Sequence, residues 1–195
     1  MKLVKCIYCG NSDSVDEIIN DDNKVVYRCY SCGRSSSQAI SLDSRLKLEL
    51  SKTGELQHQS IGILVRNRKK QVLMVKRRFF PFSWAIVFGH VHNGENFESA
   101  AKRELIEETG IKAEKLKSVY EEVINAGCRT NVRLHHVKIF ETIVDDDTFI
   151  VPNSESEFVI WVDLKEIGKV YKPVGDSTRK ILERLHLAKI HAPKK

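Results

Sequence analysis

The alternation of apolar and polar residues predicts a chain of strands interrupted by two helices. Runs rich in β-branched and aromatic residues predict strands at residues 58–67, 70–78, 82–89, 117–125, 131–144 and 157–163, the first two joined as a hairpin by a basic turn. Strong helix formers predict a helix at 97–109, with Asn96 as its N-cap and Gly110 as its stop, and a second helix at 176–187. Strands and helices mix without a βαβ repeat, so the expected fold class is α+β, a mixed sheet with helices packed on it.

The first 35 residues carry a separate signal in their cysteines. Four of the five cysteines form two C-x2-C pairs separated by 19 residues: Cys6, Cys9, Cys29 and Cys32. Two such knuckles form the tetrahedral four-sulfur cage that zinc prefers. Between them, two short strands joined by a polar turn at Asp21, Asp22 and Asn23 complete the pattern of a zinc ribbon. Two disulfides or a redox pair are the alternatives. The fifth cysteine, Cys128, is expected to be a free thiol.

These patterns predict three segments, a zinc ribbon at 1–35, a linker at 36–55 and a larger domain at 56–190. No apolar run is long enough to span a bilayer, and the start lacks the apolar stretch of a signal peptide. We therefore expect a cytoplasmic protein without a membrane partner. The net charge is +6, and its excess lies in residues 163–195, with nine basic and four acidic residues. A solvated helix face or a phosphate-rich partner would explain this excess.

The predicted helix at 97–109 concentrates negative charge on one face. Glu104, Glu107 and Glu108 stand at positions i, i+3 and i+4, where their side chains are neighbours and repel one another. A solvated helix surface is one interpretation. The other is a site for a hard divalent cation, Mg²⁺ or Mn²⁺, which prefers oxygen ligands. Arg103 faces about 100° away on the helix, so we expect it to brace Glu95 without neutralising the three glutamates.

The frame around these glutamates resembles the Nudix box, G-x5-E-x7-R-E-U-x-E-E-x-G-U with U apolar, over residues 89–111. The resemblance implies an α/β/α sandwich around a mixed sheet at residues 56–190. It also implies hydrolysis of a diphosphate linkage in a nucleoside diphosphate joined to another moiety, such as NAD(H), ADP-ribose or a nucleoside triphosphate. Glu104, Glu107 and Glu108 would then bind the catalytic Mg²⁺ or Mn²⁺, and Arg103 and Glu95 would form the ion pair that orients them. Gly89 would belong to the loop through which the backbone comes close to metal and phosphate. Many members have a glycine before this one; here the residue is Phe88.

Residues outside the box are candidates for the base and for substrate contacts. A glutamate can serve as the general base. The resemblance allows it to come from the box, where Glu108 would be a metal ligand close to the water, or from a later loop, where residues 153–158 offer Glu155 and Glu157, of which Glu157 is our weaker candidate. Arg77 and Arg78 follow the second predicted strand and could grip phosphate, or form an ordinary solvated cluster. Trp84 could stack on a base or pack in the core. His90 and His92 also lie near the box.

A zinc ribbon before a Nudix domain resembles the arrangement in NADH pyrophosphatases, which act on NAD(H) and on NAD-capped RNA. Their S-Q-P-W-P-F-P-x-S signature is missing downstream of the box. The expected partner is a small nucleotide, with capped RNA and a homodimer as further options. The alternative function is a nucleotide-sensing or nucleic-acid-binding regulator without catalysis. The complete carboxylate set argues against it, as does the balanced charge of residues 1–55, with eight basic and eight acidic residues.

Overall fold

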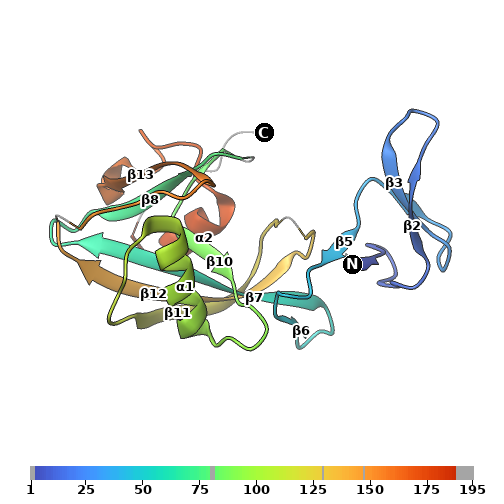
Figure 1. Ribbon diagram of the computed structural model, residues 1–195, viewed down its shortest axis with the longest axis horizontal. Coiled ribbons are helices and arrows are strands. Elements are labelled where there is room, and N and C mark those ends of the chain that lie inside the picture. Colours follow the sequence, from blue (N-terminus) through green and yellow to red (C-terminus); the bar gives the residue numbers. More distant parts are fainter. Residues whose placement is uncertain (1–2, 80–81, 129, 147, 188–195) are drawn as a thin grey trace.

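The computed structural model describes residues 3–79, 82–128, 130–146 and 148–187, and it consists of a large sheet with two α-helices and a smaller cysteine-bearing module (Figure 1). The elements of the N-terminal part are β1 (Leu3–Lys5), β2 (Val15–Ile19), β3 (Val25–Cys29), β4 (Ser35–Ser36) and β5 (Ile40–Leu42). Those of the main body are β6 (Leu48–Leu50), β7 (Leu56–Asn67), β8 (Val72–Arg77), β9 (Trp84–Ala85), β10 (Val87–His90), α1 (Phe97–Thr109), β11 (Lys117–Asn125), β12 (Leu134–Val144), β13 (Ser156–Val162), the 3-10 turn η1 (Leu164–Glu166) and α2 (Asp176–Arg184).

The main body is built on β7, which lies in the centre of an eight-stranded sheet with the order β11-β12-β7-β8-β13. Strand β12 pairs with β7 in parallel over its whole length, whereas β11, β8 and β13 pair antiparallel with their neighbours. The expected hairpin exists, but β7 and β8 share only the Arg66 to Val72 pair before they separate. Along the part of β7 that β8 does not pair with, β7 pairs with β6 and β10. The sheet is mixed, which confirms the expected fold class.

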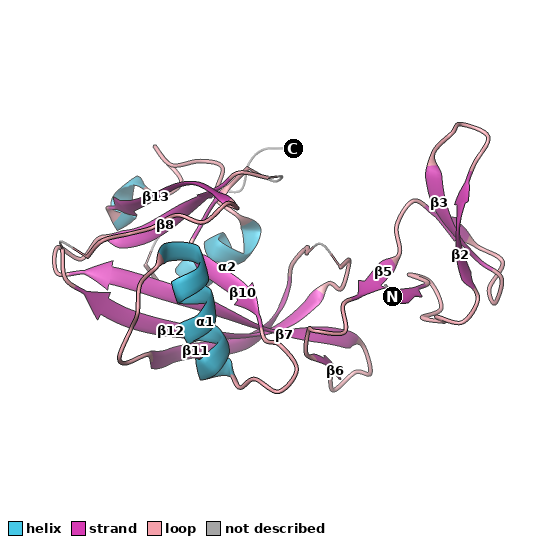
Figure 2. Cartoon of the chain, in the orientation of Figure 1, coloured by secondary structure: helices cyan, strands magenta, loops and turns pink. Residues whose placement is uncertain are grey.

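Both faces of β7 are buried, because a helix covers each side of the sheet (Figure 2). Ile61 and Ile63 pack with α1 residues such as Leu105 in one apolar cluster. The next residue along the strand, Leu64, points the other way and packs with Ile181 of α2 in a second cluster. This alternation follows from the two-residue period of a strand. The result is the layered sandwich that the sequence predicts.

Most predicted elements occupy the expected places, with differences at their ends. The helix at 97–109 and the strand at 117–125 are confirmed over their full lengths. The strand expected at 82–89 is interrupted: β9 pairs with β8, and β10 pairs with β7. The second helix ends at Arg184 and not at residue 187. None of the helices in the described ranges is long and apolar enough to cross a membrane.

The cysteine-bearing module stands at one end of the molecule (Figure 1). Strands β2 and β3 form the expected hairpin, and the turn between them is closed by the N–H of Asn23 bonded to the carbonyl of Asn20 at 2.9 Å. Strand β1 pairs with β5, so the chain enters and leaves the module side by side. The prediction of two short strands around a polar turn is confirmed.

The segment 36–55 is more ordered than a linker would be. Its last part, β6, pairs antiparallel with β7, and the Lys47 N–H bonds the Val91 carbonyl at 2.8 Å. Its first part, β5, contacts the loop 126–133 through the Ser41 N–H, which bonds the Thr130 carbonyl at 2.9 Å. Residues 45–50 therefore extend the main sheet. The boundaries 1–35, 36–55 and 56–190 stay a prediction, and residues 188–190 lie outside the described ranges.

Candidate active site at the acidic helix

Local signals fix both ends of α1. The Asn96 side chain accepts a hydrogen bond from the Ser99 N–H at 2.8 Å, as the predicted N-cap should. Gly110 has a φ of 73°, the left-handed conformation that ends many helices, and its N–H bonds the Ile106 carbonyl. Between these ends, Ala100, Ala101 and Leu105 are buried against the sheet. The small alanines let α1 lie close to β10.

That close packing brings the Glu104 carboxylate against Gly89. A Cβ atom at Gly89 would lie 2.1 Å from Cδ of Glu104 and 2.3 Å from its Oε1, so only glycine leaves room for the side chain. Gly89 lies in β10, paired with Ile61, as the strand predicted at 82–89 requires, and not in the loop that the resemblance to the box implies. Glycine is therefore required here for steric reasons, because a side chain on this strand residue would occupy the space of the Glu104 carboxylate.

Arg103 connects the carboxylates to one another and to β10. Its Nε donates to Glu95 Oε1 at 2.8 Å and its Nη2 to Glu95 Oε2 at 3.0 Å, a two-bond fork that holds the pKa of Glu95 below its usual range. Its Nη2 also donates to the His90 carbonyl at 2.9 Å. The Arg103–Glu95 pairing matches the expectation from the box.

The expectation that Arg103 would leave the glutamate trio alone is wrong. Its Nη1 donates to Glu104 Oε1 at 2.7 Å and to Glu107 Oε2 at 3.0 Å. The long guanidinium side chain overcomes the angular offset between neighbouring helix positions, since its five donors can reach several acceptors at once. Arg103 therefore neutralises part of the charge and fixes the carboxylate oxygens in place.

Burial raises the pKa of two of the three glutamates. Burial is the main cause of the raised pKa of Glu104, and the charge of Glu107 adds to it against the opposing effect of Arg103. Burial, with the charge of Glu104 next, raises the pKa of Glu108 to about 8. Crowded and partly desolvated carboxylates are costly to ionise without a nearby cation.

The donor set fits a hard divalent cation. Glu104, Glu107 and Glu108 present carboxylate oxygens from one helix face, with Glu104 against Gly89 of β10, and oxygen donors are those that Mg²⁺ and Mn²⁺ prefer. A cation among them would offset the charge repulsion that raises the pKa of Glu108. The residues present are therefore compatible with the metal that the box implies.

Of the two predicted arginines, Arg77 lies nearer to the glutamates. Its charge lowers the pKa of Glu108, opposing the effect of burial. Arg78 instead supports the loop before β13: its Nη2 donates to the Ser156 carbonyl at 3.2 Å, and its N–H bonds the Glu155 carbonyl at 2.9 Å. Arg78 therefore positions this loop.

Of the two glutamates weighed as a base, Glu155 is the one whose charge acts on Glu108. The charge of Glu155 contributes to the raised pKa of Glu108. Glu157, our candidate from the sequence, is exposed and stands at an irregularity in the pairing of β13 with β8. The irregularity shifts the strand by one residue, which sequence reading alone does not reveal.

The structure does not support the base-stacking role considered for Trp84 and corrects it to core packing. Its ring packs on the cluster shared with α2, at 5.2 Å from the Tyr171 ring in an edge-to-face arrangement. This face of the sheet is opposite to the one covered by α1. Trp84 therefore belongs to the core. The aromatic run 79–84 around it includes residues 80 and 81, which lie outside the described ranges.

Phe88, which stands where many Nudix proteins have glycine, is accommodated by another glycine across the sheet. Phe88 pairs with Gly62 of β7, and a Cβ at Gly62 would lie 3.1 Å from the Phe88 ring. The ring packs into the α2-side cluster, away from the glutamates. The Phe88 side chain therefore leaves the face that carries Glu104 open.

The four N-terminal cysteines form a compact group. The Sγ atoms of Cys6 and Cys32 lie 3.8 Å apart and those of Cys9 and Cys29 lie 3.6 Å apart, and all four are within 4.8 Å of one another. A tetrahedron with Zn–S bonds of about 2.3 Å has sulfur atoms about 3.8 Å apart. Backbone hydrogen bonding, from Cys32 first, lowers the pKa of the Cys29 thiol to about 6. The group fits a zinc ion.

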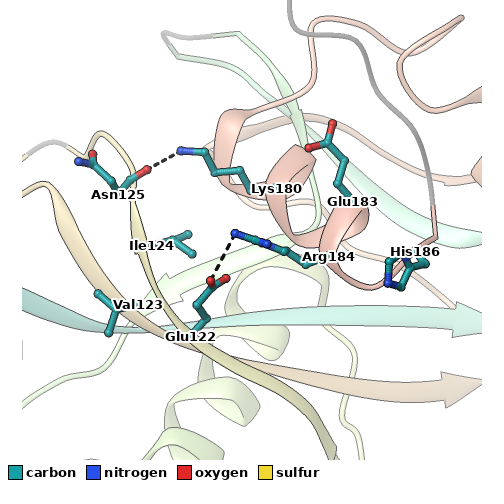
Figure 3. A pocket seen from close by; sticks show the side chains of 8 residues that line it. All are labelled: Glu122, Val123, Ile124, Asn125, Lys180, Glu183, Arg184 and His186. Atoms are coloured by element: carbon teal, nitrogen blue, oxygen red, sulfur yellow. Dashed lines mark hydrogen bonds and ion pairs between the residues drawn. The ribbon is translucent and has the colours of Figure 1, made fainter.

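A hollow of about 530 Å³ lies on the other side of the sheet, between β11 and α2 (Figure 3). Arg184 forms an ion pair with Glu122 at 3.5 Å there, and Lys180 Nζ donates to the Asn125 carbonyl at 2.6 Å. Charged groups that line the hollow are thus already bonded to neighbouring groups of the protein, and none of the glutamates of the Nudix box lines the hollow. The acidic face of α1 remains the better candidate for chemistry.

Sequence reasoning missed a buried group of histidines beside the box. His58 of β7, His90 of β10 and Cys128 of the following loop place their ligand atoms within 4.8 Å of one another. These residues are separated by 32 and 38 positions in the sequence, so no short sequence motif predicts that they lie together. The pairing of β10 with β7 brings in His90, and the pairing of β12 with β7 brings in the loop that carries Cys128.

Comparison with known proteins adds relatives that match a short part of the chain. A Bacillus subtilis protein provisionally named 8-oxo-dGTP diphosphatase is 44% identical over 55 residues, which are 28% of this chain and 36% of that protein. The RNA pyrophosphohydrolase of Shewanella pealeana is 46% identical over 55 residues, 28% of this chain and 31% of that protein. The chain thus spans about a third of the length of these curated relatives.

Solved structures share the fold over a larger part of this chain than the curated relatives match. The Caenorhabditis elegans Ap4A hydrolase matches with a TM-score of 0.52 and 22% identity, over 66% of this chain and 98% of that one. The NUDIX domain of Shewanella oneidensis NrtR, complexed with ADP ribose, matches with a TM-score of 0.56 and 15% identity, over 71% and 92%. At these identities the likeness concerns the fold alone. The NUDIX domain family model matches residues 56–185, and with the box, the sandwich and these neighbours in agreement, the chain belongs to the Nudix family.

Proposed function

We propose that this chain is a divalent-metal-dependent hydrolase that cleaves a diphosphate linkage in a nucleotide. The observation that carries the proposal is the glutamate group of α1, in which Arg103 bonds Glu104 and Glu107 and the Glu104 carboxylate lies against Gly89. A solvated helix face would not need a strand glycine to admit a buried carboxylate, nor a guanidinium bonded to three carboxylates. Both features hold the oxygens in a defined arrangement, as metal coordination demands.

Each residue has a distinct task in this proposal. Glu104, Glu107 and Glu108 hold Mg²⁺ or Mn²⁺, which would neutralise phosphate charge and lower the pKa of a bound water. Arg103 and Glu95 fix the carboxylates from behind, as an outer layer of hydrogen bonds does around metal ligands. Arg77, whose charge acts on Glu108, would contact a phosphate oxygen of the substrate.

The general base is a glutamate that takes a proton from the attacking water. Glu155 interacts electrostatically with Glu108 and lies on the loop that Arg78 supports. Glu157 is two residues further on; both side chains are exposed, and the charge of Glu155 is the one that acts on Glu108. We favour Glu155 over Glu157, because a base must reach the water directly or through one further water.

The substrate class is a nucleoside diphosphate joined to another group. The curated relatives are named for 8-oxo-dGTP and for RNA, and the neighbours for Ap4A and ADP-ribose, all of which contain linked phosphates. NAD(H), ADP-ribose, nucleoside triphosphates and the 5′ end of RNA are therefore the substrates to compare.

A hydrolysis screen with Mg²⁺ and Mn²⁺ tests the proposal. It should cover NADH, ADP-ribose, dinucleoside polyphosphates, nucleotide sugars, (d)NTPs and 5′-triphosphate RNA. We expect metal-dependent turnover that Glu107→Gln with Glu108→Gln lowers by about 10²-fold or more. Glu98→Gln is the matched control, since Glu98 is on the same helix but pairs with Lys102 at 2.7 Å. Nucleotide binding without turnover on any substrate would identify a regulator instead.

The cysteine module is proposed to be a structural zinc ribbon. Its group of about 35 residues is too small to fold by burial alone, so zinc would supply its folding energy. A four-thiol cage needs reduced cysteines, which supports the cytoplasm as the location. A homodimer is a further proposal, which sedimentation analysis would test.

A further inference from the structure

The His58, His90 and Cys128 group lies in the interior, between β7, β10 and the loop 126–133. The His58 side chain is fully buried, and the centroids of the His58 and His90 rings are 4.7 Å apart. A third imidazole, His135, is 3% exposed, with its ring centroid 5.6 Å from each of the other two. Imidazoles packed this closely share one small volume, to which Cys128 adds its sulfur.

A single hydroxyl organises two of the three side chains. Thr130 Oγ1 lies 2.7 Å from His58 Nε2 and 2.8 Å from Cys128 Sγ. If His58 Nε2–H donates to this oxygen, the hydroxyl proton is directed to the sulfur. This arrangement leaves the Nδ1 lone pair of His58 available, and the Cys128 thiol in turn donates to the Val132 carbonyl at 3.3 Å. Metal-binding histidines are oriented in the same way, by a hydrogen bond to the ring nitrogen that does not bind.

The other ring nitrogen of His58 has no partner among the described residues. Nδ1 is buried and makes no hydrogen bond there. A buried polar atom without a partner is unusual, and each such atom needs an explanation, of which an ion is one. A cation bound at Nδ1 would explain it here.

We propose that His58, His90 and Cys128 bind a zinc ion, separate from both the four-cysteine cage and the glutamates of α1. Two imidazole nitrogens and a thiolate are borderline to soft donors that suit zinc and not Mg²⁺. Zn–N bonds of about 2.0–2.1 Å and a Zn–S bond of about 2.3 Å place the three ligand atoms about 3.3–3.6 Å apart. One ring nitrogen of each histidine and the Cys128 sulfur already lie within 4.8 Å of one another, so side-chain rotations would bring the ligand atoms to these distances. Water fills the fourth position, and the thiol proton of Cys128 is released to solvent on binding.

The proposed ion would tie three parts of the chain together. His90 immediately follows Gly89, and its carbonyl accepts the hydrogen bond from Arg103. The loop with Cys128 also contacts the segment that leads out of the cysteine module, since Asn131 Nδ2 donates to the Ala39 carbonyl at 2.7 Å. The ion would thus link these three parts of the chain. It fixes the loop 126–133 against the strand that carries Gly89.

Zinc content of the full-length protein tests the proposal. The protein is purified with excess Mg²⁺ in the buffer, so that the glutamates do not retain zinc, and analysed by elemental mass spectrometry. We expect two zinc ions per chain, falling to one in Cys128→Ser and to one in Cys29→Ser, which removes the cage and leaves the second ion. His186→Gln, which changes an exposed histidine near the C-terminal helix, should keep two.

Cobalt substitution distinguishes the two sites without any activity assay. In Cys29→Ser, the remaining Co²⁺ should show the weak charge-transfer absorption of a single thiolate, which Cys128→Ser should lack. If Cys128→Ser does not fold, His58→Gln replaces it, with the same expected loss of one zinc. One zinc per chain in the wild type, with an unchanged count in Cys128→Ser or His58→Gln, would overturn the proposal.

Discussion

Alanine in place of Gly89 should abolish metal-dependent turnover and leave the fold in place. The new Cβ would lie 2.1 Å from Cδ and 2.4 Å from Cγ of Glu104, whereas carbon atoms in ordinary contact are about 3.5–4.0 Å apart. The Glu104 carboxylate must therefore move by more than about 1 Å. Because the clash involves the far end of a flexible side chain and no backbone atom, the side chain can move away while the strand stays paired.

The size of the effect follows from that displacement. A misplacement of about 1 Å in a catalytic site can cost about 10²-fold in rate, or about 2.7 kcal/mol in the activation free energy. The moved carboxylate also loses its 2.7 Å bond from Arg103. We expect kcat to fall by about 10²-fold, while the free energy of unfolding changes by about 1 kcal/mol.

The assay compares kcat at saturating Mg²⁺, on the best substrate of the screen, with the thermal midpoint measured by circular dichroism. Gly127→Ala is the matched control, since a Cβ there meets nothing within 4 Å. Gly127→Ala should keep the kcat and the thermal midpoint of the wild type. Wild-type turnover in Gly89→Ala would refute the argument that Glu104 must lie against the strand. A collapse of the thermal midpoint would refute the argument that only a side chain moves.

Further predictions test the remaining groups. Arg103→Lys keeps the charge but loses the forked hydrogen bonds, so the Mg²⁺ concentration for half-maximal rate should rise about 10-fold or more; an unchanged metal titration would contradict the bracing role. Glu155→Gln should lower kcat by about 10²-fold and flatten its pH profile, while Glu157→Gln should do neither; the reverse result would return the base to Glu157. For Asp176, burial is outweighed by two basic neighbours on α2, which hold its pKa below the usual range. The unfolded chain then takes up the proton first, so Asp176→Asn should cost about 0.5 kcal/mol in unfolding free energy at pH 7 and almost nothing near pH 2; equal costs at both would contradict this. Chelation of zinc should unfold residues 1–35, seen as faster proteolysis there, and spare the strand pairing of the main sheet.

The acidic helix shows what a local signal can predict. The cap at Asn96, the stop at Gly110 and the spacing of the glutamates are all set within about four turns of one helix, and all are found as predicted. The same holds for the cysteine module, where the hairpin and the two knuckles are close in sequence. Short-range geometry follows from residue order, because a few residues of helix or turn leave little freedom.

The pairing of strands that are far apart in the sequence could not be predicted from the sequence. The parallel alignment of β12 with β7, and of His135 opposite His58, joins residues 77 positions apart. Nothing in either strand specifies this partner. The same reason explains why β6 was expected in a linker, and why Trp84 and Phe88 were not assigned to the face of the sheet that α2 covers. Alternation predicts that a strand has two faces, but the topology decides which layer covers each.

The charge of the site links substrate binding to the metal. With all five ionised, the carboxylates of Glu95, Glu104, Glu107, Glu108 and Glu155 exceed the guanidiniums of Arg103 and Arg77 by three formal charges. The raised pKa of Glu108, about 8, reduces this excess to about two at pH 7 when no cation is bound. A diphosphate is itself an anion, and it would be repelled from such a site. The cation must therefore enter with or before the substrate, so the nucleotide should fail to bind in EDTA and not merely fail to react. Glu107→Gln with Glu108→Gln removes two of the formal charges, which should restore weak metal-free binding without turnover. In this way the carboxylates that would support catalysis also exclude nucleotides that arrive without metal.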